Sequence, residues 1–200
     1  PSYLKDYQAH PAIMAERYNY PHLTWMSAKE TADRLGSSRY LGGTRDTGTG
    51  HIHPLKFLVG LAKAAAKSGA RLCENSKVTK LGVERGKVVA QTATGTVTAG
   101  KSLLAVNAYG HDVEPVSAAH IMPIGSFIGA TEPLPADTTV IPGGESVDDS
   151  RFVVRYFRKT KDNRLLFGGR EIYSANSPAE IESGVRRQIA EGYPALAGVK

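Results

Sequence analysis

The segment from Pro54 to Ala70, PLKFLVGLAKAAAKSGA, constrains the fold more than any other part of the sequence. Proline suits the first turn of a helix, and Gly69 is a common kind of helix end. Between them, apolar residues recur at the spacing of one helical face: Leu55, Leu58, Leu61, Ala62 and Ala65. Further alanines at positions 64 and 66 leave a small surface that permits close packing. The pattern therefore predicts a helix over residues 54–69 that packs on a sheet.

Short β-rich segments follow this helix, separated by the turn signals Arg85-Gly86 and Thr94-Gly95. They predict a strand at 71–74, a three-stranded meander over 77–100 and a buried strand at Leu103–Val106. Cys73 falls in the first of these strands, where we expect an inert buried thiol. A helix followed by strands beside a meander favours an α/β layer over an all-β sandwich.

Two capping boxes mark further helices. Ser27 and Glu30 have the spacing of the first, and Gly36 is a suitable end for that helix. Ser177 and Glu180 have the spacing of the second, with proline at the first helical position. In that second helix the apolar residues Ile181, Val185 and Ile189 share one face.

The C-terminal part is typical of an antiparallel sheet. Strand-like segments occupy residues 120–134, 138–142, 151–160 and 163–173, and Lys161-Asp162-Asn163 forms a hairpin turn between the last two. Residues 37–50 are rich in glycine, serine and threonine, which predicts a loop with short extended pieces.

Composition excludes several classes of protein. Lys and Arg number 25 against 19 Asp and Glu, but the basic residues are scattered, so we expect no nucleic-acid partner. The one cysteine permits no intramolecular disulfide, which suits a reducing compartment and a cytoplasmic protein. No apolar stretch approaches the roughly 20 residues that span a bilayer.

The pair His51-x-His53 has three interpretations. Alternation along a strand would place both rings on one face, as in metal-dependent hydrolases. A zinc site needs further ligands, and His111, His120 and the carboxylates have no recognisable ligand spacing. The other interpretations are a contact to substrate or cofactor, and polar side chains at a junction between strand and helix.

Two other segments are candidates for ligand contact. Alternation over 151–158 places Tyr156 and Arg158 on the same face, where an arginine beside a tyrosine could hold a carboxylate. Basic residues on a hydrated sheet face are the alternative. Gly168-Gly169 would allow another group to approach the backbone closely. The segment 103–110, LLAVNAYG, either delivers ligand contacts at a sheet edge or simply leads into a polar loop.

No familiar catalytic motif is present. The glycine-rich stretches match neither GxGxxG nor GxxxxGK[ST], and no Ser/His/Asp or Cys/His set has a known spacing. No catalytic residue is assigned.

The order of these motifs resembles a known family. The segments GGTRDTGTGHIHPLKFLVGLAKAAAKSGARLCENSKVTKL, TATGTVTAGKSLLAVNAYG and RYFRKTKDNRLLFGGRE are similar, as an ordered set, to the FAD-dependent D-amino-acid oxidase-like superfamily. The likeness is strongest to its gamma-glutamylputrescine oxidoreductase group and to glycine and sarcosine oxidases. It covers about residues 20–195 and implies FAD as cofactor and a small amine or amino acid as substrate.

The resemblance also implies roles for residues. It implies FAD contacts from the Val78 backbone and from the 105–109 segment, that is from Ala105, Asn107, Ala108 and Tyr109. It implies substrate contacts from Tyr156 and Arg158, on a sheet that roofs the flavin, and a pocket role for His51 or His53. The expected reaction is transfer of a hydride equivalent from the α-carbon of a neutral amine to the flavin, followed by hydrolysis of the imine.

The expected architecture is an α/β (α+β) fold with part of an FAD-binding layer and its small meander, plus an antiparallel substrate-domain sheet with helices. We expect residues 1–47 to belong with the substrate domain, 48–112 to form part of the FAD-binding domain, and 113–200 to form the substrate domain. Because the family's strand–GxGxxG–helix is not in the sequence, we expect a central fragment that is inactive alone, does not retain FAD and can self-associate. The alternatives are a non-catalytic ligand-binding or interaction domain, and a metal hydrolase that uses His51 and His53.

Overall fold

The computed structural model describes residues 3–110, 113–172 and 178–199. It divides into two compact units: unit 1 is Pro1–His51 with Gly125–Lys200, and unit 2 is Ile52–Ile124. Helices and antiparallel sheets occur in both, which gives the mixed α/β fold that the sequence predicts.

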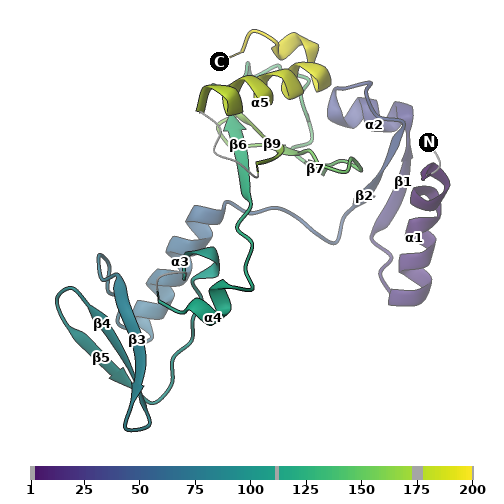
Figure 1. Cartoon of the computed structure of the whole chain (residues 1–200). Helices are drawn as coiled ribbons and strands as arrows, with labels where there is room; N and C mark the ends of the chain where they lie inside the picture. Colours follow the sequence, from purple (N-terminus) through teal and green to yellow (C-terminus); the bar gives the residue numbers. More distant parts are fainter. Residues whose placement is uncertain (1–2, 111–112, 173–177, 200) are drawn as a thin grey trace. The chain divides into compact units, whose positions relative to one another are not determined.

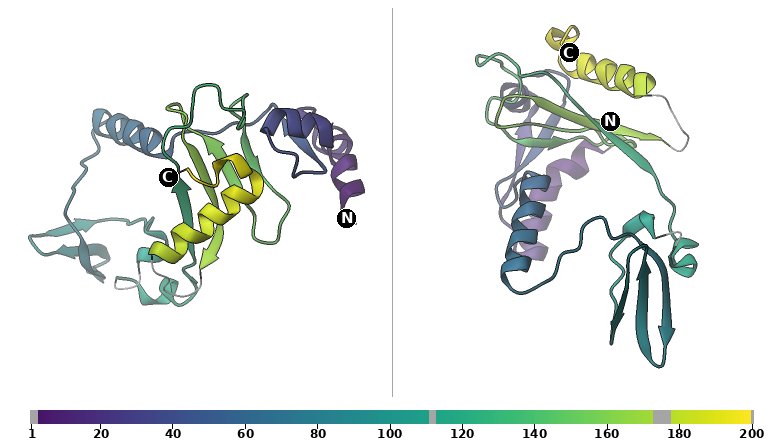
Figure 2. Two further views of the ribbon diagram at one scale, coloured as in Figure 1. Left: turned by 90° about the horizontal axis from the view of Figure 1, so that it is seen from above. Right: turned by 90° about the vertical axis from the view of Figure 1, so that its left-hand side faces the viewer.

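Unit 1 contains a four-stranded antiparallel sheet covered on one face by a helix (Figures 1 and 2). The strands are β6 (Gly125–Ala130), β7 (Ser146–Asp148), β8 (Tyr156–Lys159) and β9 (Leu165–Ile172), in the order β6-β9-β8-β7. The covering helix α5 (Pro178–Gly192) leads into the short helix η2 (Pro194–Leu196). Pro178 begins α5 as predicted, while Ser177 lies outside the described residues.

The core of unit 1 lies between this sheet and α5. Phe157 and Phe167 stack at 5.1 Å between ring centres, and Tyr193 meets Phe157 edge-on at 6.0 Å. Val185 and Ile189 of α5 are buried in the same cluster, as their shared helical face predicts. The Tyr193 hydroxyl donates to the Leu35 carbonyl oxygen, which ties the N-terminal segment to this core.

The N-terminal part of unit 1 adds two helices and a two-stranded sheet. The elements are α1 (Leu4–Tyr18), β1 (Leu23–Ser27), α2 (Ala28–Leu35) and β2 (Gly42–Asp46), with β1 and β2 antiparallel. The predicted capping box is confirmed: the Glu30 N–H donates to Ser27 Oγ, and the Ser27 N–H donates to the Glu30 carboxylate. Gly36 ends α2 at φ 67°, where a Cβ atom would lie 2.0 Å from the Thr139 carbonyl oxygen.

Substituting Ser27 with alanine is expected to destabilise unit 1 by about 1 kcal/mol, because the Glu30 N–H loses its acceptor at the start of α2. Urea unfolding followed by circular dichroism measures the change. Ser38→Ala is the matched control, since Ser38 is exposed and its hydroxyl has no hydrogen bond among the described residues. An equal loss in both variants would contradict the capping role.

Unit 2 contains the predicted helix and meander. Helix α3 (Pro54–Lys67) starts at the predicted proline, and β3 (Val78–Glu84), β4 (Lys87–Thr92) and β5 (Thr96–Ala99) pair in sequence order (Figure 2, right). The short helices η1 (Asn107–Tyr109) and α4 (Pro115–Ala118) follow. The apolar stripe of α3 is exposed, with Leu55 at 63% and Leu58 at 62%.

Several predicted strands are wrong. Residues 71–74 and 103–106 have no strand, Cys73 is exposed rather than buried, and Leu103 is 89% exposed. No described strand pairs with either segment, and an extended segment without a partner leaves its backbone groups unbonded. Residues 138–142 also form no strand: Ile141 is fully buried in a loop at φ 41°, with its N–H on the Leu35 carbonyl oxygen.

The predicted strand over 151–160 is shorter than expected, because Asp149 holds its first half in a loop. One Asp149 carboxylate oxygen accepts hydrogen bonds from the backbone N–H groups of Arg151 and Arg155. The other oxygen accepts a hydrogen bond from the Arg151 side chain, whose Nε atom lies 2.7 Å away. Regular pairing starts only at Tyr156. The hairpin turn at 161–163 is confirmed, since Thr160 and Arg164 close it by backbone hydrogen bonding.

Candidate functional site: an open sheet face and a polar cavity in unit 1

The four-stranded sheet of unit 1 has two chemically different faces. Phe157, Leu165 and Phe167 point to the α5 side and are buried. Because side chains alternate along a strand, Tyr156 and Arg158 project from the opposite face, as the sequence predicts. The register places Tyr156 beside Gly168 and Asp148, and Arg158 beside Leu166 and Ser146. This surface is termed the open face.

Tyr156 is held in a fixed position on the open face. Its hydroxyl oxygen lies 2.6 Å from Ser126 Oγ on β6, so the side chain reaches across β9. The ring lies directly over Gly168, where an added Cβ atom would be 2.3 Å from Tyr156 Cε2. The Tyr156 ring is therefore the group that approaches the backbone closely at the Gly168-Gly169 pair.

Arg158 is the next side chain along β8 on the open face. It is half-buried, and no described residue forms an ion pair or hydrogen bond with its guanidinium group. A partly buried guanidinium without a partner retains its paired N–H donors for a planar anion such as a carboxylate.

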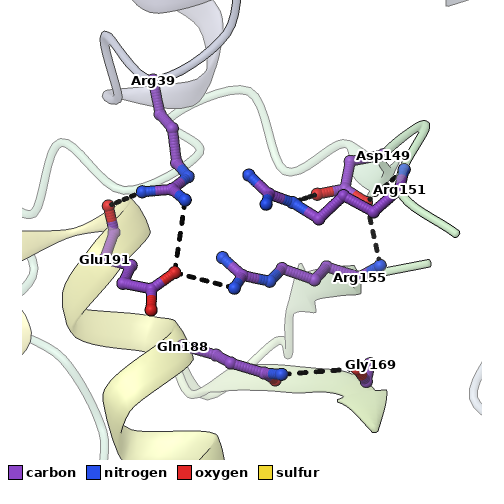
Figure 3. Close-up of polar contacts among 7 residues, drawn as sticks. All are labelled: Arg39, Asp149, Arg151, Arg155, Gly169, Gln188 and Glu191. Atoms are coloured by element: carbon purple, nitrogen blue, oxygen red, sulfur yellow. Dashed lines mark hydrogen bonds and ion pairs between the residues drawn. The ribbon is translucent and has the colours of Figure 1, made fainter. Parts of the chain in front are cut away.

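A network of charged residues fixes β8 against α5 (Figure 3). Arg155, which precedes Tyr156, donates from Nη2 to Glu191 at 2.7 Å, and Arg39 donates to the same carboxylate oxygen at 3.2 Å. The hydrogen bond from Arg155 holds the pKa of Glu191 below its usual value, against the opposing effect of burial. Because Arg155 is adjacent in sequence to Tyr156, this network also positions the start of β8.

The two histidines have separate surroundings. His51 Nε2 lies 3.1 Å from the Gly144 carbonyl oxygen, within unit 1. His53 belongs to unit 2 and caps α3, where its Nδ1 accepts the Lys56 N–H at 3.4 Å. Within residues 3–110, 113–172 and 178–199, no group of three or more His, Cys, Asp or Glu side chains could hold a metal ion.

His51 lines a polar cavity of about 340 Å³ in unit 1. Arg34 donates to Glu145 Oε1 across it at 2.5 Å, which joins α2 to the segment before β7. Burial opposes ionisation of Asp46, but hydrogen bonds from the Gly48 N–H and the Tyr20 hydroxyl hold the pKa of Asp46 below its usual value. Ser146 and Asp148 also line the cavity, so it borders the β7 edge of the open face.

The predicted cofactor residues all lie in unit 2. Asn107 and Ala108 line a cavity of about 420 Å³ with Leu104, Val106, Gly110, Glu114, Ala118, Ile121 and Pro123. Ala105 and Tyr109 do not line it, and Tyr109 is 92% exposed. Val78 begins β3 opposite Thr92, next to an irregularity in the register, and is not among the lining residues.

The fit of this cavity to FAD is partial. The side chain of Ala108 is small, and Asn107 supplies a polar group. The space beside Gly110 is already filled, because Val106 Cγ2 lies 2.7 Å from the position of an added Cβ atom. No glycine-rich phosphate loop occurs in the sequence, so these residues do not form a binding site for the pyrophosphate group of FAD.

Sequence reasoning missed two groups in unit 1. Ser126, the partner of Tyr156, lies 30 residues away and has no motif of its own. Arg34 and Glu145 are 111 residues apart, so only the tertiary fold brings them together. The single signal available for the first pair was Gly168, whose lack of a side chain makes room for a ring.

No helix among the described residues is long and apolar enough to cross a membrane.

Comparisons with known proteins agree on one family. A family model described as FAD dependent oxidoreductase (DAO) matches residues 2–200. The probable oxidoreductase OrdL of Rhizobium meliloti is 57% identical over 196 residues, covering 98% of this chain and 46% of that protein. Gamma-glutamylputrescine oxidoreductase of Escherichia coli is 39% identical over 188 residues, covering 92% of this chain and 44% of that protein.

Solved structures show the same fold. Glycine oxidase from Geobacillus kaustophilus aligns with a TM-score of 0.72 at 19% identity, covering 93% of this chain and 50% of that one. L-proline dehydrogenase from P. horikoshii aligns with a TM-score of 0.72 at 20% identity, covering 92% and 51%. The chain thus spans about half the length of the relatives it matches, and it belongs to the DAO family of FAD-dependent oxidoreductases.

Proposed function

We propose that this chain is the central part of an FAD-dependent oxidoreductase that oxidises the C–N bond of a small amine or amino acid to an imine. The observation that carries the proposal is the open face, where Arg158 has no partner among the described residues and Tyr156 is fixed beside it. An amino acid offers the carboxylate that such an arginine binds.

The names of similar proteins support this substrate class. One relative is a gamma-glutamylputrescine oxidoreductase and one structural neighbour is a glycine oxidase. When bound, FAD would supply the redox chemistry by accepting the hydride equivalent, and the protein would supply position and electrostatics. We propose that the part of the protein that holds FAD includes Asn107 and Ala108, together with Val78, Ala105 and Tyr109.

The proposed domains follow the same division. Residues 48–112 form part of the FAD domain, and residues 1–47 and 113–200 form the substrate domain.

In this proposal the chain's own residues bind and orient the substrate. Arg158 binds the carboxylate through paired N–H groups. The Tyr156 ring, fixed by Ser126 and Gly168, limits where the α-carbon can lie. His51 lies at the neighbouring cavity with one nitrogen on the Gly144 carbonyl oxygen, which leaves the other nitrogen for a substrate contact. His53 caps α3 through Nδ1, so a substrate contact from it would use Nε2.

Replacing Arg158 with alanine in the full-length protein is expected to raise KM for amino-acid substrates by about 10- to 100-fold, because a charge-assisted hydrogen-bonded pair is lost. Steady-state kinetics with amino acids and with matched amines that lack a carboxylate measure the effect. The amines should be unaffected. Lys161→Ala removes an exposed positive charge from the nearby turn and serves as control. An equal rise for both substrate types would contradict carboxylate binding.

The reaction class has its own test. The full-length protein should purify with flavin absorbance that bleaches anaerobically when the amine is added. A colourless protein that takes up no FAD on reconstitution would instead favour a non-catalytic ligand-binding domain. Zinc at about one equivalent, lost in a His51→Ala/His53→Ala double variant, would favour a metal hydrolase.

A further inference from the structure

Three arginine side chains of unit 1 gather near the C-terminal end of α5 (Figure 3). Arg39 comes from the loop between α2 and β2, while Arg151 and Arg155 come from the segment between β7 and β8. The hydrogen bond from Arg155, followed by the charges of all three arginines, holds the pKa of Glu191 below its usual value. All three guanidinium groups therefore lie near this one carboxylate, and like charges so close together repel unless negative charge lies between them.

The carboxylates that pair with these arginines do not balance their charge. Glu191 and Asp149 supply two negative charges against three positive ones, which leaves one positive charge in excess. Arg155 and Arg39 also share a single oxygen of Glu191, at 2.7 and 3.2 Å. A further anion would therefore be attracted to the cluster.

Arg151 retains the donors that such an anion needs. Its Nε atom bonds to Asp149 at 2.7 Å, and its two terminal nitrogens have no hydrogen-bond partner among the described residues. Figure 3 shows these nitrogens turned away from Asp149, toward the guanidinium groups of Arg39 and Arg155. The Asp149 carboxylate is 5% exposed and also accepts the Arg155 backbone N–H, so it holds Arg151 in this orientation.

The cluster can be reached from solvent. The Arg151 side chain is 41% exposed and the Arg39 side chain 31%, whereas the Arg155 side chain is 11% exposed. A ligand can thus contact the terminal nitrogens of Arg151 directly. The more deeply placed charge of Arg155 adds attraction that solvent and salt screen less than at a fully exposed position.

The arrangement of the donors selects the kind of anion. One guanidinium group is enough to bind a planar carboxylate through two parallel hydrogen bonds. Guanidinium groups from three positions in the chain suit an anion whose oxygens point in several directions, as those of a phosphate group do. We propose that Arg39, Arg151 and Arg155 form a binding site for a phosphate group, separate from the carboxylate contact of Arg158 and independent of the oxidase proposal.

Titration of the full-length protein with inorganic phosphate tests the proposal, with calorimetry reporting binding and sodium chloride keeping the ionic strength constant. We expect saturable binding that Arg151→Gln weakens about tenfold, because a charge-assisted hydrogen bond is lost. Arg151→Lys keeps the charge but not the paired N–H groups, so its loss should be smaller. Arg158→Ala is the matched control: it removes a guanidinium group from the open face and should leave phosphate binding unchanged.

Removing the internal counter-charge should have the opposite effect. Glu191→Gln leaves Arg39 and Arg155 without the carboxylate that they share, so phosphate should bind this variant several-fold more tightly than the unaltered protein. Phosphate should also raise the thermal midpoint of this variant by more than that of the unaltered protein. Weaker phosphate binding to Glu191→Gln would contradict the proposed site.

Vesicles of phosphatidylglycerol distinguish the two sources of a phosphate group. Cosedimentation that is lost in Arg151→Gln would assign the group to a lipid headgroup, whereas binding of free phosphate alone would assign it to a soluble ligand. If neither the vesicles nor free phosphate binds, the two carboxylates suffice for the arginines and the proposal is overturned. Binding that persists unchanged in Arg151→Gln, or that disappears in Arg158→Ala, would place the anion elsewhere and overturn it equally.

Discussion

Replacing Phe167 with alanine is expected to lower the free energy of unfolding of unit 1 by about 3–5 kcal/mol. Phe167 is 2% exposed and stacks on Phe157 at an interplanar angle of 10°, at the centre of the cluster between the sheet and α5. Alanine would remove the stacked ring and leave a cavity that the rigid β8–β9 pair cannot close. This loss is a large fraction of the roughly 5–15 kcal/mol that typically separates folded from unfolded protein.

Urea unfolding followed by near-UV circular dichroism measures this loss, because the stacked aromatic rings contribute to that signal. Phe152→Ala is the matched control: Phe152 is fully exposed, and its removal should change stability by less than about 0.5 kcal/mol. Phe167→Leu keeps most of the apolar volume and should cost much less than alanine. Equal effects at positions 152 and 167 would mean that this cluster is not the core.

The sequence reveals features that depend on a few neighbouring residues. The capping box at Ser27–Glu30, the helix start at Pro54 and the hairpin at 161–163 each depend on local hydrogen bonds or fixed backbone angles. The alternation that separates Tyr156 from Phe157 is equally local, because it follows from strand geometry alone. These predictions are confirmed because tertiary contacts reinforce the local preferences.

Features that need a distant partner could not be predicted. Residues 71–74 and 103–106 have strand-like sequences, yet a strand exists only where another strand accepts its hydrogen bonds. Helix α1 was missed for a different reason: it contains Pro11, which is unfavourable inside a helix, and none of its residues is fully buried. Strand β7 was also not predicted, since it has only three residues and pairs with β8 on one side only.

The same division applies to the candidate site. The sequence predicts that Tyr156 and Arg158 share one face of the sheet. It does not predict that the Asp149 carboxylate holds the preceding residues in a loop, so that β8 starts only at Tyr156. It also leaves several roles open for His51 and His53, and in the structure His53 caps a helix of unit 2. The burial of the Thr31 and Thr44 hydroxyl oxygens, which have no hydrogen-bond partner in the described part of the chain, has no sequence signature because it depends on tertiary packing.

The substitution with the largest expected effect on activity is Gly168→Val, which should lower kcat/KM by about 100-fold in the full-length protein while leaving it folded. A side chain at this position would overlap the Tyr156 ring, whose Cε2 and Cζ atoms lie 2.3 and 2.5 Å from the Cβ site. The ring must then leave its place and give up the hydrogen bond to Ser126. Steady-state kinetics measure the effect, and circular dichroism confirms folding. Gly82→Val is the matched control, since nothing lies within 4 Å of its Cβ site on β3.

A double-mutant cycle decides whether the Gly168 effect acts through Tyr156. If valine is harmful because it displaces the ring, then Tyr156→Ala should lower kcat/KM by a similar factor, and adding Gly168→Val to it should cost little more. Tyr156→Phe keeps the ring over Gly168 and removes only the hydroxyl bonded to Ser126, so its loss should be smaller. Additive losses in the double variant would instead mean that Gly168 serves β9 itself, and Tyr156 would then lose its place in the substrate site.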